Sequence, residues 1–307
     1  MYLSVISPVY NASEIVDELV KRIKEEVIKI TEDFEIILVD DGSIDNSWEK
    51  VKKNCEIEKR IKGIKLSRNF GQHYAITAGL SKSTGENVVL MDCDLQDDPA
   101  YIQELLKLRK VGYDIIFTRR LQRKHGLIKS INSRLYNLLF DFFSERKYDV
   151  NAGSLTMFSR QVTHVFLQLK DKDRLYLQML KWVGFNTTTL AVEHKPRFAG
   201  KSTYSFTKLL KMGVQGWTSH STKLLKFSTV LGFFLASISI FLGISIIIRY
   251  LLYDLQPGWP SIIVSILFST GVILLSIGIT GIYVGKIFEQ VKDRPIFIIE
   301  KEVNINE

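Results

Sequence analysis

The sequence predicts an α/β domain with a mostly parallel sheet, followed by amphipathic helices and two helices that span a membrane. In the first half, short β-branched runs alternate with segments whose apolar residues recur at helical spacing, a pattern typical of a sheet covered on both faces. In the second half, two stretches lack charged residues, 227–248 and 255–285. The 307 residues are 46% apolar and 24% charged, which excludes a disordered chain. Two such stretches exclude both a purely soluble protein and a polytopic transporter.

The first half predicts five strands separated by helices. Each strand is a short run rich in Val, Ile and Leu, and the second ends in a turn signal, Asp40-Asp41-Gly42-Ser43. The helices show apolar residues three or four positions apart, as Ile15, Leu19 and Ile23 do. In order, the expected strands are 3–7, 35–39, 63–66, 87–91 and 113–118, and the expected helices are 12–30, about 45–55, 74–80 and 99–110.

The middle of the chain is less regular. Residues 127–143, 161–169 and 174–182 predict three helices, and residues 187–192 predict a strand. Residues 205–226 mix large apolar side chains with lysines and contain no acid. That composition is typical of a helix lying in the membrane interface.

Two spans are expected at about 227–250 and 260–285. The run 227–248 is about 33 Å long as a helix, enough for a hydrocarbon core of about 30 Å. Basic residues flank the outer ends, and the connector is nearly uncharged. Because positive residues stay cytoplasmic, both termini and the domain are expected inside, at the cytoplasmic (inner) membrane. The expected organisation is a domain at 1–200, interfacial helices at 201–226, a hairpin at 227–285 and a tail at 286–307.

The net charge of +8 is concentrated in two stretches without acids, 115–140 and 194–227. One-sign stretches indicate anionic partners. The second stretch continues into an apolar segment, which favours a membrane surface over nucleic acid. We therefore expect a membrane-lipid partner and no nucleic acid.

Polar residues follow three of the expected strands, where ligands of parallel sheets bind. They are Tyr10-Asn11, Asp40-Asp41 and the segment from Asp92 to Gln96. Two carboxylates, Asp92 and Asp94, with the amide oxygen of Gln96 suit Mg²⁺ or Mn²⁺ shared with a diphosphate. A turn that caps the next helix explains the same spacing equally well. Asp40 either accepts hydrogen bonds from a nucleobase or ribose or belongs to a simple turn.

Taken together, the motifs resemble the inverting glycosyltransferases of family 2, which have the GT-A fold, a Rossmann-like domain. The motifs in chain order are Pro8-Val9-Tyr10-Asn11, Val39-Asp40-Asp41-Gly42-Ser43, Asn69-Phe70-Gly71-Gln72 and Met91-Asp92-Cys93-Asp94-Leu95-Gln96-Asp97-Asp98-Pro99. Further likeness lies in Trp182-Val183-Gly184-Phe185, Arg197-Phe198-Ala199-Gly200, Tyr204, the hairpin and the tail after Arg294-Pro295. These resemble the polyprenyl-phosphate glycosyltransferases, and most of all the bacterial two-helix type that glucosylates undecaprenyl phosphate for O-antigen decoration of the cell envelope.

The resemblance implies a role for each matching residue. A nucleotide sugar, with UDP-glucose expected first, would be the donor, and a polyprenyl phosphate would be the acceptor. The implied nucleotide-binding residues are Pro8, Tyr10, Asn11, Asp40, Asp41 and Asp92. Asp92, Asp94 and Gln96 would hold Mg²⁺ or Mn²⁺, and Asp94 and Arg119 would be catalytic. The acceptor phosphate would contact Arg119, Lys129, Ser133, Arg134 and Arg197.

The chain also departs from the pattern of these enzymes. Asn151, Ser154 and Thr156 stand where relatives often carry two acids and an arginine, and Lys201-Ser202-Thr203 replaces the commoner Glu-Ser-Lys. These departures affect the choice of sugar and the acceptor pocket. Glycines at 271, 278, 281 and 285 in the second span allow association with a second copy.

Two alternatives stay open on the sequence. Gln178-Met179-Leu180-Lys181-Trp182 differs by one residue from a motif of processive synthases, which extend a polysaccharide on a hydroxyl. A hydroxyl acceptor needs a base, whereas a phosphate acceptor, with a second pKa of about 6, is already an anion. The other alternative is a non-catalytic membrane partner that binds a nucleotide sugar. Two measurements distinguish these three hypotheses. Absence of metal-dependent nucleotide binding would favour the non-catalytic partner, and transfer of sugar to a lipid phosphate would exclude the polysaccharide synthase.

Overall fold

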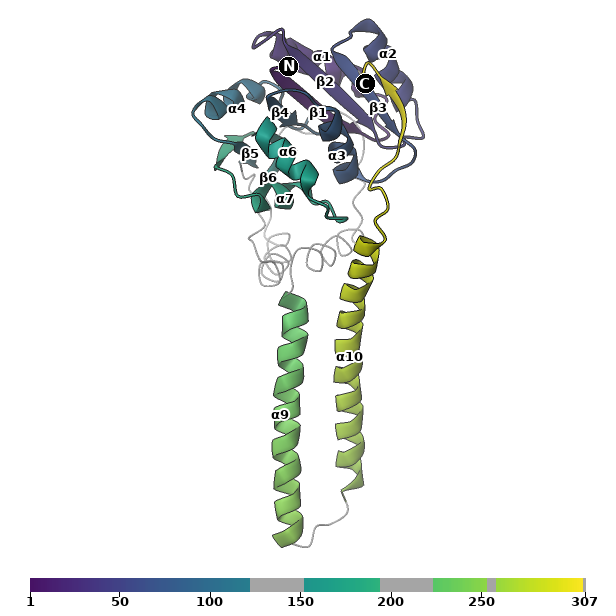
Figure 1. The fold of residues 1–307 in the computed structure, drawn as a ribbon, viewed down its shortest axis with the longest axis vertical. Coiled ribbons are helices and arrows are strands. Elements are labelled where there is room, and N and C mark those ends of the chain that lie inside the picture. The colour runs from purple at the N-terminus through teal and green to yellow at the C-terminus, as the bar shows by residue number, and fades with distance from the viewer. Residues whose placement is uncertain (122–151, 194–222, 253–257, 306–307) are drawn as a thin grey trace. The chain divides into compact units, whose positions relative to one another are not determined.

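The structure, a computed structural model, describes residues 1–121, 152–193, 223–252 and 258–305 (Figure 1). The chain divides into two units. Residues 1–125, 149–203 and 294–307 form the first, and residues 126–148 and 204–293 form the second. The last residues of the chain therefore belong with the sheet and not with the apolar helices.

An eight-stranded sheet forms the centre of the first unit. Its strands are β1 (Leu3–Val9), β2 (Phe34–Asp40), β3 (Ile61–Leu66), β4 (Asn87–Leu90), β5 (Ile115–Arg120), β6 (Ala152–Ser159), β7 (Thr187–Val192) and β8 (Ile299–Val303). They lie in the order β7-β5-β6-β4-β1-β2-β3-β8. β6 runs antiparallel to β4 and β5, and β8 runs antiparallel to β3, while the other pairs are parallel. The prediction of a mostly parallel sheet is confirmed.

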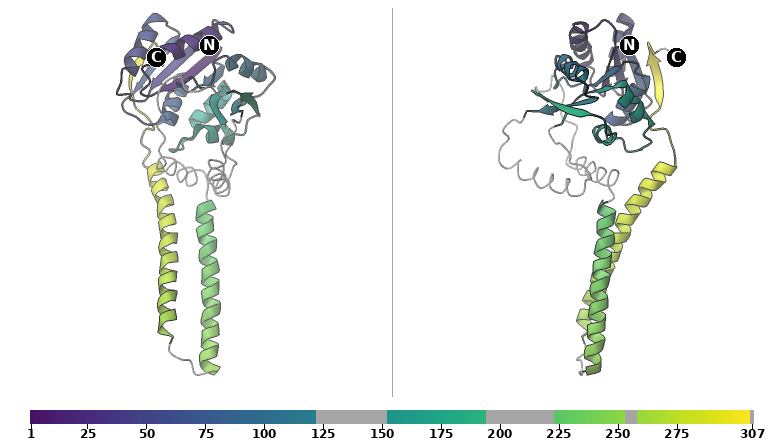
Figure 2. Two further views of the ribbon diagram at one scale, coloured as in Figure 1. Left: turned by 180° about the vertical axis from the view of Figure 1, so that it is seen from behind. Right: turned by 60° about the vertical axis from the view of Figure 1, so that its left-hand side comes forward.

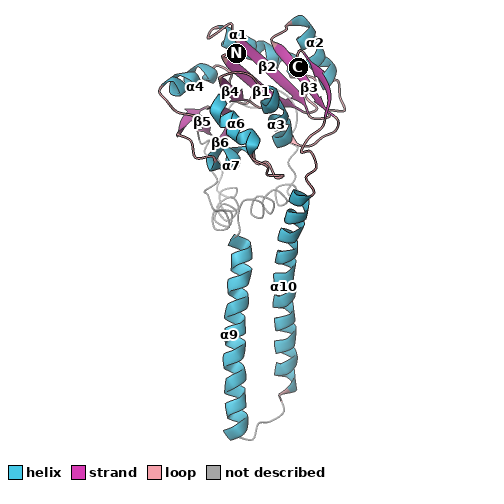
Figure 3. Ribbon diagram, in the orientation of Figure 1, coloured by secondary structure: helices cyan, strands magenta, loops and turns pink. Residues whose placement is uncertain are grey.

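Helices cover both faces of this sheet (Figure 3). One face packs against α1 (Val16–Ile28), α2 (Ser47–Ile57) and α4 (Tyr101–Lys110). The other packs against α3 (Gln72–Lys82), α6 (Arg160–Gln168) and α7 (Tyr176–Trp182). Strands β1 and β2 are buried along their whole lengths, as expected for a sheet covered twice.

Two strands, β6 and β8, were not predicted from the sequence. β8 reads Ile-Glu-Lys-Glu-Val and is largely exposed at the sheet edge, so it shows no apolar run. Contacts across the sheet hold it: Lys65 and Lys82 pair with Glu300 and Glu302 at 3.3 and 2.9 Å. The Asn304 side chain donates to two carbonyl oxygens, those of Cys55 and Ile61, at 2.6 and 2.9 Å.

Two long apolar helices, α9 (Lys223–Leu252) and α10 (Trp259–Val291), belong to the second unit. They contact each other and lie side by side (Figure 2). Both are long and apolar enough to cross a membrane, with mean hydropathies of 1.9 over Leu225–Leu242 and 1.8 over Phe268–Val291. Almost none of these side chains is buried within the chain. The expected helix at 127–143 and most of the interfacial segment 205–226 lie outside the described residues.

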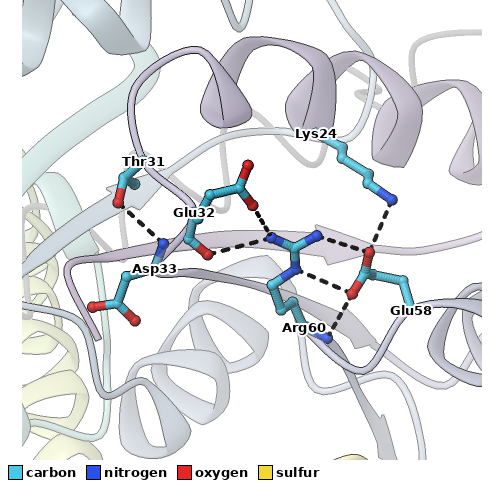
Figure 4. A network of polar contacts seen from close by, with 6 residues as sticks. All are labelled: Lys24, Thr31, Glu32, Asp33, Glu58 and Arg60. Carbon is cyan, nitrogen blue, oxygen red and sulfur yellow. Dashed lines mark hydrogen bonds and ion pairs between the residues drawn. The ribbon is translucent and has the colours of Figure 1, made fainter.

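An ion-pair network joins α1, the loop between α1 and β2, and the loop between α2 and β3 (Figure 4). The Arg60 guanidinium pairs with Glu58 at 3.0 Å and with Glu32 at 2.8 Å, and it stacks on the Phe34 ring. Lys24 donates to the same Glu58 oxygen, Oε2, that the Arg60 Nη2 contacts, at 2.9 Å. Arg60 and Lys24 hold the pKa of Glu58 down to about 2.

Glu58 is therefore expected to make stability depend on acid pH. A carboxyl whose pKa is depressed in the folded state stabilises above its unfolded pKa of about 4.3, and this contribution falls as pH drops toward 2. At neutral pH, Glu58→Gln should cost about 1–2 kcal/mol, measured as the shift in thermal unfolding of the detergent-solubilised chain. The loss should shrink below pH 4. A constant loss from pH 7 to pH 3 would contradict this linkage.

Candidate active site

The three polar segments expected at strand ends come together at one edge of the sheet. β1 lies between β2 and β4, with Val9 beside Asp40 and Ile6 beside Leu90. The chain passes from β1 outward to β2 and β3 and then returns to the other side of β1 as β4. Loops diverge at such a reversal, which leaves a crevice where ligands of α/β sheets bind.

The loop after β1 is fastened to the loop after β2 through Asn11. Its backbone is left-handed, with φ of 48°. Its side-chain oxygen accepts from the Ile44 N–H at 3.1 Å, and its own N–H donates to the Ser43 hydroxyl at 3.0 Å. Tyr10, immediately before it, is 42% exposed. Asn11 therefore shapes the loop, while the Tyr10 ring is open to a ligand.

Asp40 ends β2 as a buried carboxylate. Neither of its oxygens forms a well-aligned hydrogen bond within the described residues. Burial raises the pKa of Asp40, although the neighbouring Ser43 and the charge of Lys65 oppose this shift. A buried acceptor in this state is costly unless a donor reaches it, and an N–H group of a nucleobase or a ribose hydroxyl would supply one.

Asp41 is also buried, but its two oxygens are occupied. They accept from the N–H groups of Phe70 and Gly71, both at 2.8 Å. Burial raises its pKa to about 6 despite these bonds. Asp41 thus holds the loop that follows β3, and a nucleotide contact from it stays a prediction. Gly42 follows with φ of 66°, where an added Cβ would lie 2.3 Å from the Arg68 carbonyl carbon.

The segment after β4 gathers carboxylates. The Gln72 amide, at the start of α3, donates to Asp92 at 2.5 Å. Asp94 accepts from the Gln96 N–H at 3.2 Å, and Leu95 between them is left-handed, with φ of 55°. A leucine in that region is strained and persists where its surroundings fix it, often at functional sites.

Repulsion within this segment favours a bound cation. Burial and the negative charge of Asp94 raise the pKa of Asp92 to about 6. Among the described residues, no three His, Cys, Asp or Glu side chains converge as a metal centre. A divalent ion would instead be held by Asp92, Asp94 and the Gln96 amide, with diphosphate oxygens completing the shell, as is usual for Mg²⁺. The residues present fit such an ion.

The basic residues expected at the acceptor are only partly described. Arg119 is exposed near the end of β5, opposite Ala152 of β6. Its neighbour Arg120 exerts the positive charge that lowers the pKa of Asp92, against the larger effects that raise it. Lys129, Ser133, Arg134 and Arg197 lie outside the described residues. Their predicted roles stay predictions.

Sequence reasoning assigned no role in this segment to several residues that the structure places beside it. Gln72 and Arg120 come from distant parts of the chain, and only the strand order brings them to Asp92. Asp97 precedes Asp98-Pro99, a sequence typical of a helix cap. It is instead buried and accepts from the Ser154 hydroxyl and the Leu155 N–H, and Asp98 makes the local turn by accepting from the Ala100 N–H.

Comparisons with known proteins agree with this architecture. Residues 4–166 match the glycosyl transferase family 2 domain. The SfII prophage-derived bactoprenol glucosyl transferase of Shigella flexneri is 33% identical over 304 residues, 98% of each chain. The undecaprenyl-phosphate 4-deoxy-4-formamido-L-arabinose transferase of Proteus mirabilis is 30% identical over 307 residues, 99% of this chain and 94% of that one. The crystal structure of a mycobacterial protein, 15% identical, shares the fold with a TM-score of 0.51 over 71% of this chain and 73% of that one.

Proposed function

Because this chain belongs to glycosyltransferase family 2, we propose that it transfers a hexose from a nucleotide sugar to the phosphate of a polyprenyl phosphate. UDP-glucose is the first donor to test and undecaprenyl phosphate the first acceptor. One observation carries the proposal. The likeness to a protein named for glucosyl transfer to bactoprenol covers 98% of the chain, so it includes both apolar helices as well as the sheet.

The carboxyl edge of the sheet supports binding of the donor. Asp40 offers a buried acceptor that lacks a well-aligned donor, suited to a nucleobase or ribose. Tyr10 offers an exposed ring for stacking. Asp92, Asp94 and Gln96 would hold Mg²⁺ or Mn²⁺ against the diphosphate, and that ion supplies positive charge to the leaving group when bound.

In the proposed reaction, the main task of the protein is to position the acceptor phosphate against the nucleotide sugar. A phosphate monoester has a second pKa of about 6, so it is already a nucleophile at neutral pH and needs no base. Arg119 would orient the acceptor anion and shield it from the donor's charge. Attack in line with the departing diphosphate would invert the sugar carbon.

The apolar helices support a membrane location for this reaction. Both α9 and α10 expose large apolar side chains along their lengths, and the lysines lie at their outer ends. With the positive ends on the cytoplasmic side, the sheet and both termini would face the cytoplasm at the inner membrane, where nucleotide sugars are available. The glycines of α10 would allow association of two copies.

Mass spectrometry of reactions in detergent tests the proposal. The purified full-length chain would be given Mn²⁺ or Mg²⁺, undecaprenyl phosphate and a panel of UDP-, GDP- and dTDP-sugars. A lipid carrying one phosphate and one hexose is the expected product, and it names the sugar. A lipid with two phosphates would overturn the mechanism, since it means transfer of a phosphosugar. Sugar on an oligosaccharide hydroxyl would replace the acceptor class.

Arg119→Ala is expected to raise KM for undecaprenyl phosphate about tenfold, because one charge-assisted hydrogen bond to phosphate is lost. KM for the nucleotide sugar should change little. Steady-state kinetics with each substrate varied separately measures both values. Arg22→Ala, which removes an arginine paired with Glu18 on α1, is the matched control. An equal rise in both KM values would argue against a role at the acceptor.

A further inference from the structure

Asp97 directly follows Gln96, the last of the predicted metal ligands, but its side chain contacts β6. Its side chain is 2% exposed. One carboxylate oxygen accepts from the Ser154 hydroxyl at 2.6 Å and from the Leu155 N–H at 3.1 Å. β6 runs antiparallel to β4, with Leu90 beside Thr156, so the segment that leaves β4 passes along the first residues of β6. The contact therefore joins the carboxylate-rich segment to the sheet.

The start of β6 is itself held in place. The Leu155 carbonyl accepts from the Thr118 hydroxyl of β5 at 2.6 Å, and the Ser154 carbonyl accepts from the Tyr176 hydroxyl of α7 at 3.4 Å. Gly153 allows this approach, because an added Cβ would lie 2.2 Å from the Thr118 hydroxyl oxygen. Ser154 thus presents its hydroxyl from a backbone that two other elements fix.

The turn between Asp92 and Asp97 needs fixed ends. Leu95 holds a left-handed backbone that its side chain disfavours. The first end is bound where the Gln72 amide meets Asp92 at 2.5 Å. The second end is bound where Asp97 meets Ser154. Releasing the second end would let the strained turn relax and would separate Asp94 and Gln96 from Asp92.

We propose that Asp97 and Ser154 are positioning residues that hold the Asp92–Gln96 turn in the shape that binds a divalent cation together with a nucleotide diphosphate. This inference rests on the proposed function. Neither residue touches the substrate. They act by setting the directions of the oxygens of Asp92, Asp94 and Gln96, as residues behind the ligands of a metal do.

The identity of residue 154 decides whether the side-chain part of this anchor can form, while the Leu155 N–H donates to Asp97 whatever residue stands at 154. A hydroxyl donates a proton to the Asp97 carboxylate, whereas an ionised acid has no proton to donate and would add a further negative charge.

The test measures metal binding directly. Electron paramagnetic resonance would follow free Mn²⁺ with the purified full-length chain in detergent, in the presence of UDP, GDP or dTDP in turn. Ser154→Ala is expected to weaken Mn²⁺ binding about tenfold. Ser154→Thr keeps the hydroxyl and should bind Mn²⁺ within about twofold of the natural chain. Ser81→Ala is the matched control, since its hydroxyl bonds only within α3 in the described contacts, to the Ala78 carbonyl.

The outcomes separate the two levels of inference. If the natural chain binds no Mn²⁺ with any of the nucleotides, the proposed function fails and this inference falls with it. If the natural chain binds Mn²⁺ and Ser154→Ala binds it equally well, only the positioning role is overturned. Equal weakening by Ala and Thr would also overturn it. Should Ser154→Ala fail to fold, as judged by thermal unfolding, Asp97→Ala tests the same bond, because it removes the carboxylate that accepts the Ser154 hydroxyl proton.

Discussion

Asp94→Ala is expected to lower the rate of sugar transfer by at least about 10³-fold, because it removes a carboxylate that would hold the cation on the leaving diphosphate. Transfer to undecaprenyl phosphate, followed by mass spectrometry with purified protein, measures the loss. Thermal unfolding of the same variant should occur at the same temperature or higher. Burial, together with repulsion by Asp94, raises the pKa of Asp92 to about 6, so removing Asp94 relieves part of an unfavourable interaction that serves binding.

Asp98→Asn is the matched control for this prediction. Asp98 is a carboxylate of the same segment, and it accepts from the Ala100 N–H at 3.1 Å in a local turn. An asparagine can accept the same bond, so activity should stay within about twofold of the natural chain. Normal transfer by Asp94→Ala would exclude a metal-binding role for that carboxylate. The segment would then be explained as a turn that caps the next helix.

The largest loss of stability is expected for Glu35→Ala, which lies at the amino ends of the strands, opposite the candidate site. Glu35 is fully buried at the start of β2. It pairs with Lys62 at 2.6 Å and accepts from the Ser4 hydroxyl at 2.5 Å and the Thr84 N–H at 2.6 Å. The Thr84 hydroxyl also donates to it at 2.9 Å. Removing Glu35 leaves a nearly buried lysine and three donors without their acceptor, which should cost about 3–5 kcal/mol. Urea or thermal unfolding measures the difference.

The direction of the pH dependence follows from the same contacts. Burial raises the pKa of Glu35, but its bonds to Lys62, Ser4 and Thr84 outweigh burial and lower it overall. A lowered folded pKa means that the stabilisation is present above the unfolded value of about 4.3 and is lost as pH falls below it. Glu300→Ala is the matched control, since it breaks an exposed pair with Lys65 and should cost less than about 1 kcal/mol. Similar losses for the two variants would show that burial does not strengthen the Glu35 pair.

The sequence could predict those elements whose signal is local. β1, β2 and β4 are unbroken apolar runs, and α1 repeats apolar residues at helical spacing, so each was expected near its observed bounds. β6 contains Gly153, Ser154 and Thr156 and lacks such a run. β8 is an exposed edge strand of alternating charge. Both strands exist because neighbours across the sheet accept their backbone bonds, which no pattern within five to eight residues reveals.

The candidate site shows the same division between sequence and structure. Their position after expected strands predicted Asp40, Asp92 and Asp94 as site residues, because the carboxyl ends of strands in a parallel sheet meet at one edge. Only the structure shows that neighbouring carboxylates have different hydrogen-bond partners. Asp40 lacks a well-aligned donor while Asp41 binds two N–H groups, and Asp97 turns away to Ser154.

By itself, then, the sequence determined the α/β class, the family and two helices fit to cross a membrane, and it predicted the edge of the sheet at which the candidate site lies. Periodicity, composition and the order of motifs depend on residues that are close in the sequence, so they can be analysed without knowing which residues contact each other in the fold. Only the tertiary structure decided which side chains meet at that edge. Gln72, Arg120 and Ser154 reach Asp92 or Asp97 because β4 lies between β1 and β6, and strand order is set by packing across the whole sheet.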